Sequence, residues 1–179
     1  MSLTRRLFLS AAPLVLLPTG AKADLYDDYI NSSSRQPFVS FFARDDTLTG
    51  HAFVSVGTEL DNGLTVYEGI YGYYPASMEK KIMKFRGTDR GMITFKENDY
   101  PSAIRYRKNV DDSTKAKALA VFDKWKSEDP KYNVLAMGGK NCNSLAKEVA
   151  QAIGIKVPSD NPGATFPANY IRLIKEANP

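Results

Sequence analysis

The stretch Asn141-Cys142-Asn143-Ser144 marks the point where an extended approach gives way to an amphipathic helix. After it, Leu145, Val149 and Ile153 recur at the spacing of a single helix face. The chain contains one cysteine, and this pattern places it at the start of the helix. The stretch therefore predicts a helix that begins at Cys142 and packs its apolar face against the rest of the domain.

A cysteine at a helix N-terminus is a candidate nucleophile, because backbone N–H groups and the helix dipole favour the thiolate there. We expect Asn141 or Lys140 to cap the helix. We also expect the backbone N–H groups of Cys142 and Asn141 to stabilise an oxyanion. The prediction is an accessible thiol of low pKa, and the alternative is a buried structural cysteine that packs like a small hydrophobic residue.

The only histidine opens the clearest strand pattern in the chain. Residues 51–57 alternate as a strand, Asp61-Asn62-Gly63 is a turn signal, and residues 64–70 return as a second strand. The pattern predicts a β-hairpin with His51 at its start. An imidazole titrates near neutral pH, so His51 is the candidate base for Cys142, with a surface histidine as the alternative.

Glu68 lies on the return strand and is a candidate to orient the imidazole, unless it is simply an exposed strand residue. Two registers fit the hairpin. A two-residue turn at Asn62-Gly63 places His51 opposite Tyr74, whereas a longer loop from Thr58 to Gly63 places Glu68 diagonal to His51. Both registers put Glu68 and His51 on one face, because they differ by an even number of residues. The hairpin sequence alone does not choose between them.

The first 23 residues have the pattern of an export signal. Arg5-Arg6 precedes a short apolar stretch, and Ala21-Lys22-Ala23 offers small residues at a cleavage site. We expect a twin-arginine-type signal peptide at 1–23 and a mature domain at 24–179, located in a bacterial periplasm or secreted. An ordinary secretory signal and a permanent anchor are the alternatives. Contact with a membrane is expected only during export.

Composition excludes several kinds of partner and cofactor. Loss of Arg5, Arg6 and Lys22 with the signal lowers the formal charge from +4 to +1, so nothing favours a nucleic-acid partner. One cysteine and one histidine do not provide a zinc ligand set, and no phosphate-binding glycine loop is present. We expect one domain, no cofactor, no metal and a monomer.

Further patterns complete the expected architecture. Strands are expected near 38–42, 91–95 and 103–108, a helix after Asp112 that ends before Pro130, and a last helix that Pro167 opens. The alternation near 38–42 is poor. The expected fold class is α+β, an antiparallel sheet packed against the helix that carries Cys142.

Two sets of motifs resemble known families. Gly50-His51-Ala52-Phe53-Val54, followed by Val66-Tyr67-Glu68-Gly69, resembles the histidine hairpin of permuted NlpC-type hydrolases, which are circularly permuted papain-like enzymes. Residues 141–149, followed by Ile155-Lys156-Val157-Pro158, are similar to the cysteine motif of the PPPDE thiol peptidases. One departure is Met137-Gly138-Gly139-Lys140, which lengthens the approach to the cysteine.

The resemblance implies a permuted papain-like fold with Cys142 as nucleophile, His51 as base and Glu68 as the group that orients the imidazole. It favours the longer hairpin loop, since that register brings Glu68 to His51. The implied function is an exported thiol peptidase or amidase that acts through a thioester, with peptides or peptidoglycan fragments as substrate. The alternatives are an acyl hydrolase or acyltransferase acting on lipid esters, and a catalytically silent binding module.

Overall fold

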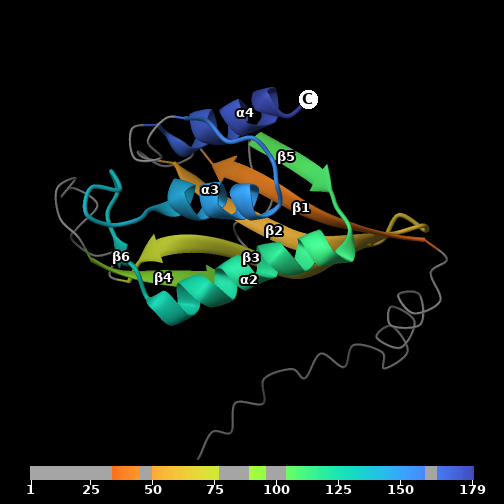
Figure 1. The fold of residues 1–179 in the computed structure, drawn as a ribbon, viewed down its shortest axis with the longest axis horizontal. Coiled ribbons are helices and arrows are strands. Elements are labelled where there is room, and N and C mark those ends of the chain that lie inside the picture. Colours follow the sequence, from red (N-terminus) through yellow and green to blue (C-terminus); the bar gives the residue numbers. More distant parts are fainter. Residues whose placement is uncertain (1–33, 45–49, 77–88, 96–103, 160–164) are drawn as a thin grey trace, which may run out of the picture. The chain divides into compact units, whose positions relative to one another are not determined.

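The computed structural model describes residues 34–44, 50–76, 89–95, 104–159 and 165–179. They belong to one compact unit, Ser34–Pro179, and the expected signal peptide at 1–23 lies outside the described residues. Figure 1 shows the elements in chain order: β1 (Arg35–Arg44), β2 (His51–Leu60), β3 (Thr65–Pro75), β4 (Asp89–Phe95), β5 (Ile104–Asn109), α2 (Asp112–Glu128), β6 (Lys131–Tyr132), α3 (Cys142–Ala152) and α4 (Pro167–Ala177).

The described strands form an antiparallel sheet in the order β5-β1-β2-β3-β4-β6. Helices α2, α3 and α4 pack on one face of it, which we call the helix face (Figure 1). The predicted α+β class, with an antiparallel sheet against the cysteine helix, is therefore confirmed. None of the helices in the described part is long and apolar enough to cross a membrane.

The core lies between the helix face and the three helices. Val39 pairs with Val56 and Phe41 with Val54, so β1 and β2 present one apolar row to the helices. The helices contribute fully or almost fully buried side chains to the same cluster: Ala118, Phe122, Trp125, Leu145, Val149, Ile171 and Ile174. Burial of this kind is worth roughly 1.5–3 kcal/mol for each large apolar side chain.

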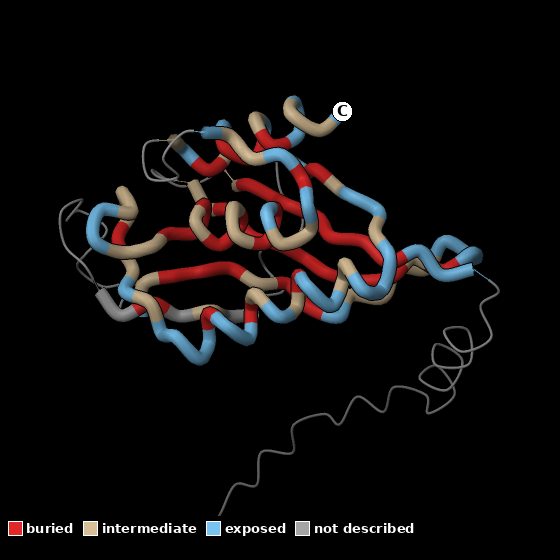
Figure 2. The backbone as a smooth tube through the Cα atoms, in the orientation of Figure 1, coloured by how far each residue is buried: buried red, intermediate tan, exposed pale blue. Residues whose placement is uncertain are grey.

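The opposite face of the sheet, here the aromatic face, carries a second buried cluster. Phe42 stacks on Phe53 with ring centroids 4.9 Å apart, and Ile70 completes the cluster. Of the described helices, none contributes to it. Because β1 and β2 bury residues on both faces, Figure 2 draws them red along most of their length. This double burial explains why the alternation expected of a strand is weak near residues 38–42.

Helix α2 lies across β3 and β4. Its N-cap is Asp111, whose carboxylate accepts a 2.7 Å hydrogen bond from the backbone of Thr114, one residue before the expected start. Phe122 stacks on Tyr71 at 4.1 Å, and Trp125 meets the edge of Tyr73 at 4.8 Å. These contacts fix α2 on the helix face.

The β2–β3 hairpin differs from the prediction in two respects, the length of its loop and the face of the sheet on which Glu68 lies. Leu60 and Leu64 close a three-residue loop, so the longer loop favoured by the family resemblance is wrong. Gly63 takes φ +81°, the left-handed conformation that such loops require. Further along, Val56 pairs with Gly69 but Gly57 pairs with Tyr67, so Glu68 is the extra residue of a β-bulge.

The bulge changes the face on which Glu68 lies. Beyond it, Phe53 pairs with Gly72, which puts His51 level with Tyr74 as in the shorter predicted register. Glu68 itself contacts Thr58, which shares the helix face with Val56. The prediction that Glu68 and His51 share one face is therefore wrong, since a bulge breaks the even spacing on which it depended.

Helices α3 and α4 begin at the end of the sheet where β2 begins (Figure 1). The side-chain amide of Asn143 donates a 2.8 Å hydrogen bond to the carbonyl of Thr165, just before α4. Pro167 opens α4 as predicted, and a Cβ added at Gly50 would lie 3.5 Å from its ring. The starts of β2, α3 and α4 are therefore neighbours.

Candidate thiol site

Cys142 occupies the first position of α3, as the sequence predicted. Asn141 is the N-cap, and its side-chain oxygen accepts a 2.9 Å hydrogen bond from the backbone N–H of Ser144. In return, the Ser144 hydroxyl accepts from the backbone N–H of Asn141 at 3.2 Å. This reciprocal capping box ends the extended approach and starts the helix at the cysteine. The expected cap by Asn141 is confirmed.

The thiol of Cys142 is buried, with 6% of the residue exposed. Burial raises the pKa of the thiol, because the charged thiolate loses its hydration. Three backbone N–H groups act in the opposite direction, those of Ala52, Asn143 and Cys142 itself, and the net shift is upward. The expectation of an accessible thiol of low pKa is therefore wrong for this conformation of the protein.

The thiol nevertheless lies at the N-terminus of a helix, where backbone N–H groups and the helix dipole favour negative charge. Groups of this kind stabilise a thiolate or an oxyanion bonded next to it. In the described conformation their effect is smaller than that of burial, so the thiol is protonated.

His51 lies on the aromatic face. Its imidazole stacks on the ring of Tyr74 with centroids 4.1 Å apart, and Phe53 follows at 6.2 Å. A Cβ added at Gly72 would lie 2.6 Å from its Nε2, so the ring rests directly over that glycine. Cys142 belongs to the helix-face cluster instead. The structure does not bring the imidazole and the thiol together.

Their backbones are nevertheless close, since Ala52, the residue after His51, belongs to the same core cluster as Cys142, and its backbone N–H lowers the pKa of the thiol. Side chains of consecutive strand residues point to opposite faces, which is why contact with Ala52 excludes contact with the His51 side chain. Only a change of backbone conformation at the start of β2 brings the imidazole to the thiol. Gly50 stands there with φ +67°, a conformation that glycine adopts freely.

Glu68 is not near His51 either. Its carboxylate accepts hydrogen bonds from Lys115 of α2 at 2.6 Å and from Thr58 at 3.2 Å. Burial lowers the pKa of Lys115, but the hydrogen bond and the charge of Glu68 outweigh this and raise it. The bulge therefore directs Glu68 to a brace between the hairpin and α2.

The two oxyanion donors expected from the sequence have different surroundings. The backbone N–H of Cys142 belongs to the first turn of α3, and it and the backbone N–H of Asn143 lower the pKa of the thiol. The backbone N–H of Asn141 donates to Ser144, and its side-chain amide donates to the carbonyl of Val134 at 2.8 Å. Asn141 thus holds the approach to the helix.

A cluster that the sequence analysis missed supports the start of α3. Glu148 accepts hydrogen bonds from Lys140 at 2.5 Å and from the indole of Trp125 at 2.8 Å, and Lys124 approaches it to 3.5 Å. The Lys140 ammonium also lies 4.4 Å from the centroid of the Trp125 ring. Lys140 and Glu148 are eight residues apart on opposite sides of the cap, a spacing with no helical meaning, so no sequence signal indicated the cluster.

Tyr132 is a titratable neighbour of the thiol that the sequence analysis also left unassigned. It packs against the same core cluster as Cys142, and its ring centroid lies 5.5 Å from that of Tyr73. Burial raises its pKa, followed by the effect of charge on Cys142 and on Tyr73. Its hydroxyl is therefore neutral near pH 7.

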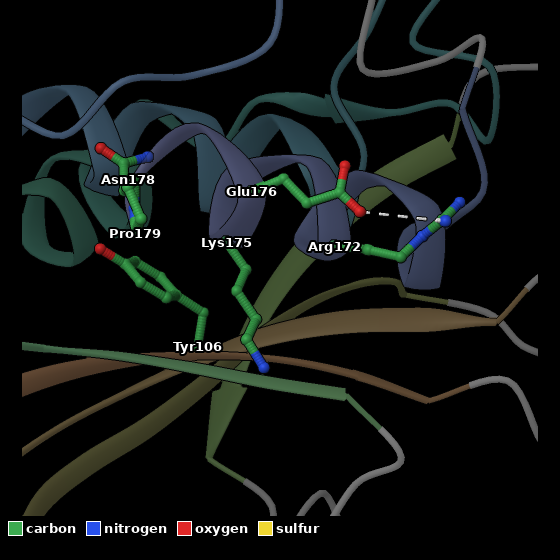
Figure 3. Close-up of a pocket in the computed structure, with 6 residues that line it drawn as sticks. All are labelled: Tyr106, Arg172, Lys175, Glu176, Asn178 and Pro179. Carbon is green, nitrogen blue, oxygen red and sulfur yellow. Dashed lines mark ion pairs between the residues drawn. The ribbon is translucent and has the colours of Figure 1, made fainter.

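A separate pocket of about 490 Å³ lies between β5 and the last turns of α4 (Figure 3). Tyr106 rises from the strand, while the remaining lining residues come from α4 and the end of the chain: Arg172, Lys175, Glu176, Asn178 and Pro179. Arg172 is held within 4.0 Å of Glu176, as the dashed line in Figure 3 marks. The pocket includes none of the candidate site residues.

Among the residues that the structure describes, no three or more His, Cys, Asp and Glu side chains group together as metal ligands would. Comparison of the chain with protein-family models, with curated proteins and with solved structures finds no match in any of the three.

Proposed function

We propose that the protein is a thiol hydrolase in which Cys142 attacks an amide or ester carbonyl. The observation that carries this proposal is that Cys142 is the first residue of α3, directly after Asn141, the N-cap that pairs with Ser144, where the helix dipole favours negative charge. A structural cysteine in an apolar core has no need of such a position. A nucleophile that must carry charge, and then sit beside an oxyanion, does.

His51 is the proposed base, since it is the only histidine of the chain and it precedes Ala52, which packs in the core cluster of Cys142. The role requires a rearrangement in which the imidazole leaves Tyr74 and turns toward Cys142. Gly50, already at φ +67°, is the residue best able to absorb that change. In this proposal the described conformation is a resting state, and Glu68 braces the hairpin without orienting the base.

The chemistry follows ordinary acyl transfer. The imidazole takes the proton of the Cys142 thiol, and the thiolate adds to the substrate carbonyl carbon. The tetrahedral oxyanion collapses, the leaving amine or alcohol takes the proton from the imidazolium, and a thioester remains on Cys142. Water, deprotonated by His51, then attacks the thioester and releases the acid, which restores the thiol. Peptides or peptidoglycan fragments are the proposed substrates, and a twin-arginine-type signal is the proposed route by which the protein is exported.

Mass spectrometry of peptidoglycan fragments, short peptides and phospholipids incubated with the protein tests this function. Wild type is expected to release products from amide substrates, and Cys142→Ala and His51→Ala are expected to release none. Arg172→Ala, in the distant pocket, is the matched control and retains activity. Product from phospholipids alone supports the ester hydrolase alternative, and equal product from Cys142→Ala contradicts the proposal.

A catalytically silent binding module is the second candidate. The observations that favour it are the buried thiol and the position of His51 on the aromatic face. It predicts that no acyl adduct forms on Cys142 with any activated ester, and that Cys142→Ala and wild type bind the same fragments equally. An adduct on the peptide that contains Cys142, detected by mass, excludes this candidate.

A further inference from the structure

Two large apolar side chains stand out because they are exposed in a described chain whose other large apolar residues are buried or half-buried. Met137 is 64% exposed and Phe166 is 67% exposed. Single exposed apolar residues are common on protein surfaces and by themselves indicate nothing. Met137 and Phe166 are distinguished by their positions in the fold and by the hydrogen bonds that hold their segments.

Met137 is at the tip of a loop that its own hydrogen bonds keep in one conformation. The loop is built around Asn133, which is 1% exposed and whose side-chain oxygen accepts from the backbone N–H groups of Leu135 and Met137, each at 3.0 Å. Ala136 takes φ +53°, a conformation that costs a residue other than glycine of the order of 1–2 kcal/mol. The loop therefore holds Met137 in solvent despite backbone strain.

The two asparagines that flank Cys142 hold the segments that carry these side chains. Asn141 donates from its amide to the carbonyl of Val134, in the loop of Met137, at 2.8 Å. Asn143 donates from its amide to the carbonyl of Thr165, the residue before Phe166, also at 2.8 Å. Both asparagines are buried. The exposed apolar side chains are therefore anchored through the immediate neighbours of the thiol.

We propose that Met137 and Phe166 are specificity-determining residues that bind an apolar group of the substrate beside Cys142. The preferred substrate is then an acyl compound with an apolar group near the scissile carbonyl, whether a hydrophobic amino acid or an alkyl chain. This inference rests on the proposed function, and it names the substrate class for that site. Substrate binding removes the exposed apolar surface of Met137 and Phe166 from water, which stabilises the complex.

Kinetics on matched substrates test the proposal. Wild type is expected to give at least about tenfold higher kcat/KM on p-nitrophenyl octanoate than on the acetate, a ratio in the range that apolar pockets provide. The double variant Met137→Ser, Phe166→Ser is expected to lose about tenfold on the octanoate and nothing on the acetate. Lys131→Ser, at the exposed base of the same loop, is the control and retains both rates. Equal loss on both esters, or no chain preference in wild type, overturns the inference.

Two further measurements distinguish failure of this inference from failure of the proposed function. Peptide p-nitroanilides with leucine or glycine at the acyl position distinguish an amino-acid side chain from an alkyl chain as the apolar group. Calorimetric titration of Cys142→Ala with N-octanoylglycine and N-acetylglycine reports binding without turnover. Cleavage that needs Cys142 but ignores chain length overturns only this inference. Tighter binding of the octanoyl compound without cleavage supports the inference and contradicts the hydrolase, and equal binding overturns the inference.

Discussion

The imidazole of His51 and the thiol of Cys142 lie on opposite faces of the sheet, although Ala52, the residue next to His51, packs in the same core cluster as Cys142. In this site, the backbones of the two residues are therefore close while their side chains are not in contact. In the proposed mechanism, this arrangement is inactive until the start of β2 changes conformation. The described conformation holds the thiol and the imidazole apart.

Alkylation of Cys142 by iodoacetamide reports this arrangement. Because burial raises the pKa of the thiol above its ordinary value near 8.5, the native protein is expected to react at least about tenfold more slowly at pH 7.5 than the urea-unfolded chain. The rate should continue to rise above pH 8.5. His51→Ala is expected to leave the profile unchanged, since the imidazole is remote. A rate that levels off below pH 7 and depends on His51 contradicts the described site.

The N-cap of α3 should contribute more to the free energy of unfolding than the N-cap of α2. Asn141→Ala removes a buried side chain that holds Ser144 and Val134, so we expect a loss of about 2 kcal/mol in the free energy of unfolding. Asp111→Ala removes an exposed cap and should cost less. Urea titrations of both variants measure the difference. Equal losses mean that the bond to Val134 adds nothing.

Glu148 links stability to pH. Burial raises its pKa, but hydrogen bonds from Lys140 and Trp125 outweigh this, and the net pKa is lowered. A depressed pKa contributes stability above the unfolded value near 4.3 and loses it as pH falls through the folded value. The difference in unfolding free energy between wild type and Glu148→Gln should therefore be constant above about pH 5.5 and shrink below about pH 4. A difference that grows on acidification contradicts this sign.

Glu68 and Lys115 should behave as a coupled structural pair. The ammonium is 12% exposed and lies 2.6 Å from the carboxylate, so each single change, Glu68→Gln or Lys115→Met, is expected to destabilise by about 1 kcal/mol. The double variant should lose less than the sum, with a coupling energy of about 0.5 kcal/mol or more. Urea denaturation gives the values, and the alkylation profile of Cys142 should not change. A changed profile in Glu68→Gln indicates a functional role for the carboxylate instead.

Local patterns in the sequence predicted much of the fold. The apolar spacing after Cys142 and the proline at residue 167 predicted α3 and α4 with their starts, because caps and helix periodicity are local properties. Strand β1 was harder to recognise, because it is buried on both faces and its residues do not alternate. The α+β class followed from these elements without knowledge of the order of the strands.

The site was less predictable than the elements that carry it. The burial of Cys142 depends on how α3 packs against β2, and no local sequence pattern determines that packing. The face of Glu68 depends on one bulge in β3, and alternation predicts faces only where the ladder is regular. The pairing of Lys140 with Glu148 requires the cap between them to be formed first, so it too is a property of the folded chain.

The bulge at Glu68 also affects how this chain tolerates changes in length. Because Val56 already pairs with Gly69 and Gly57 with Tyr67, deletion of Glu68 leaves both parts of the β2–β3 ladder in register. Deletion of Tyr67 instead moves the glutamate into the paired position and directs a carboxylate at the aromatic face. Adjacent positions of one strand therefore differ in their tolerance of a one-residue deletion, and length variation among relatives of this chain is expected at the bulge before it appears elsewhere in β3.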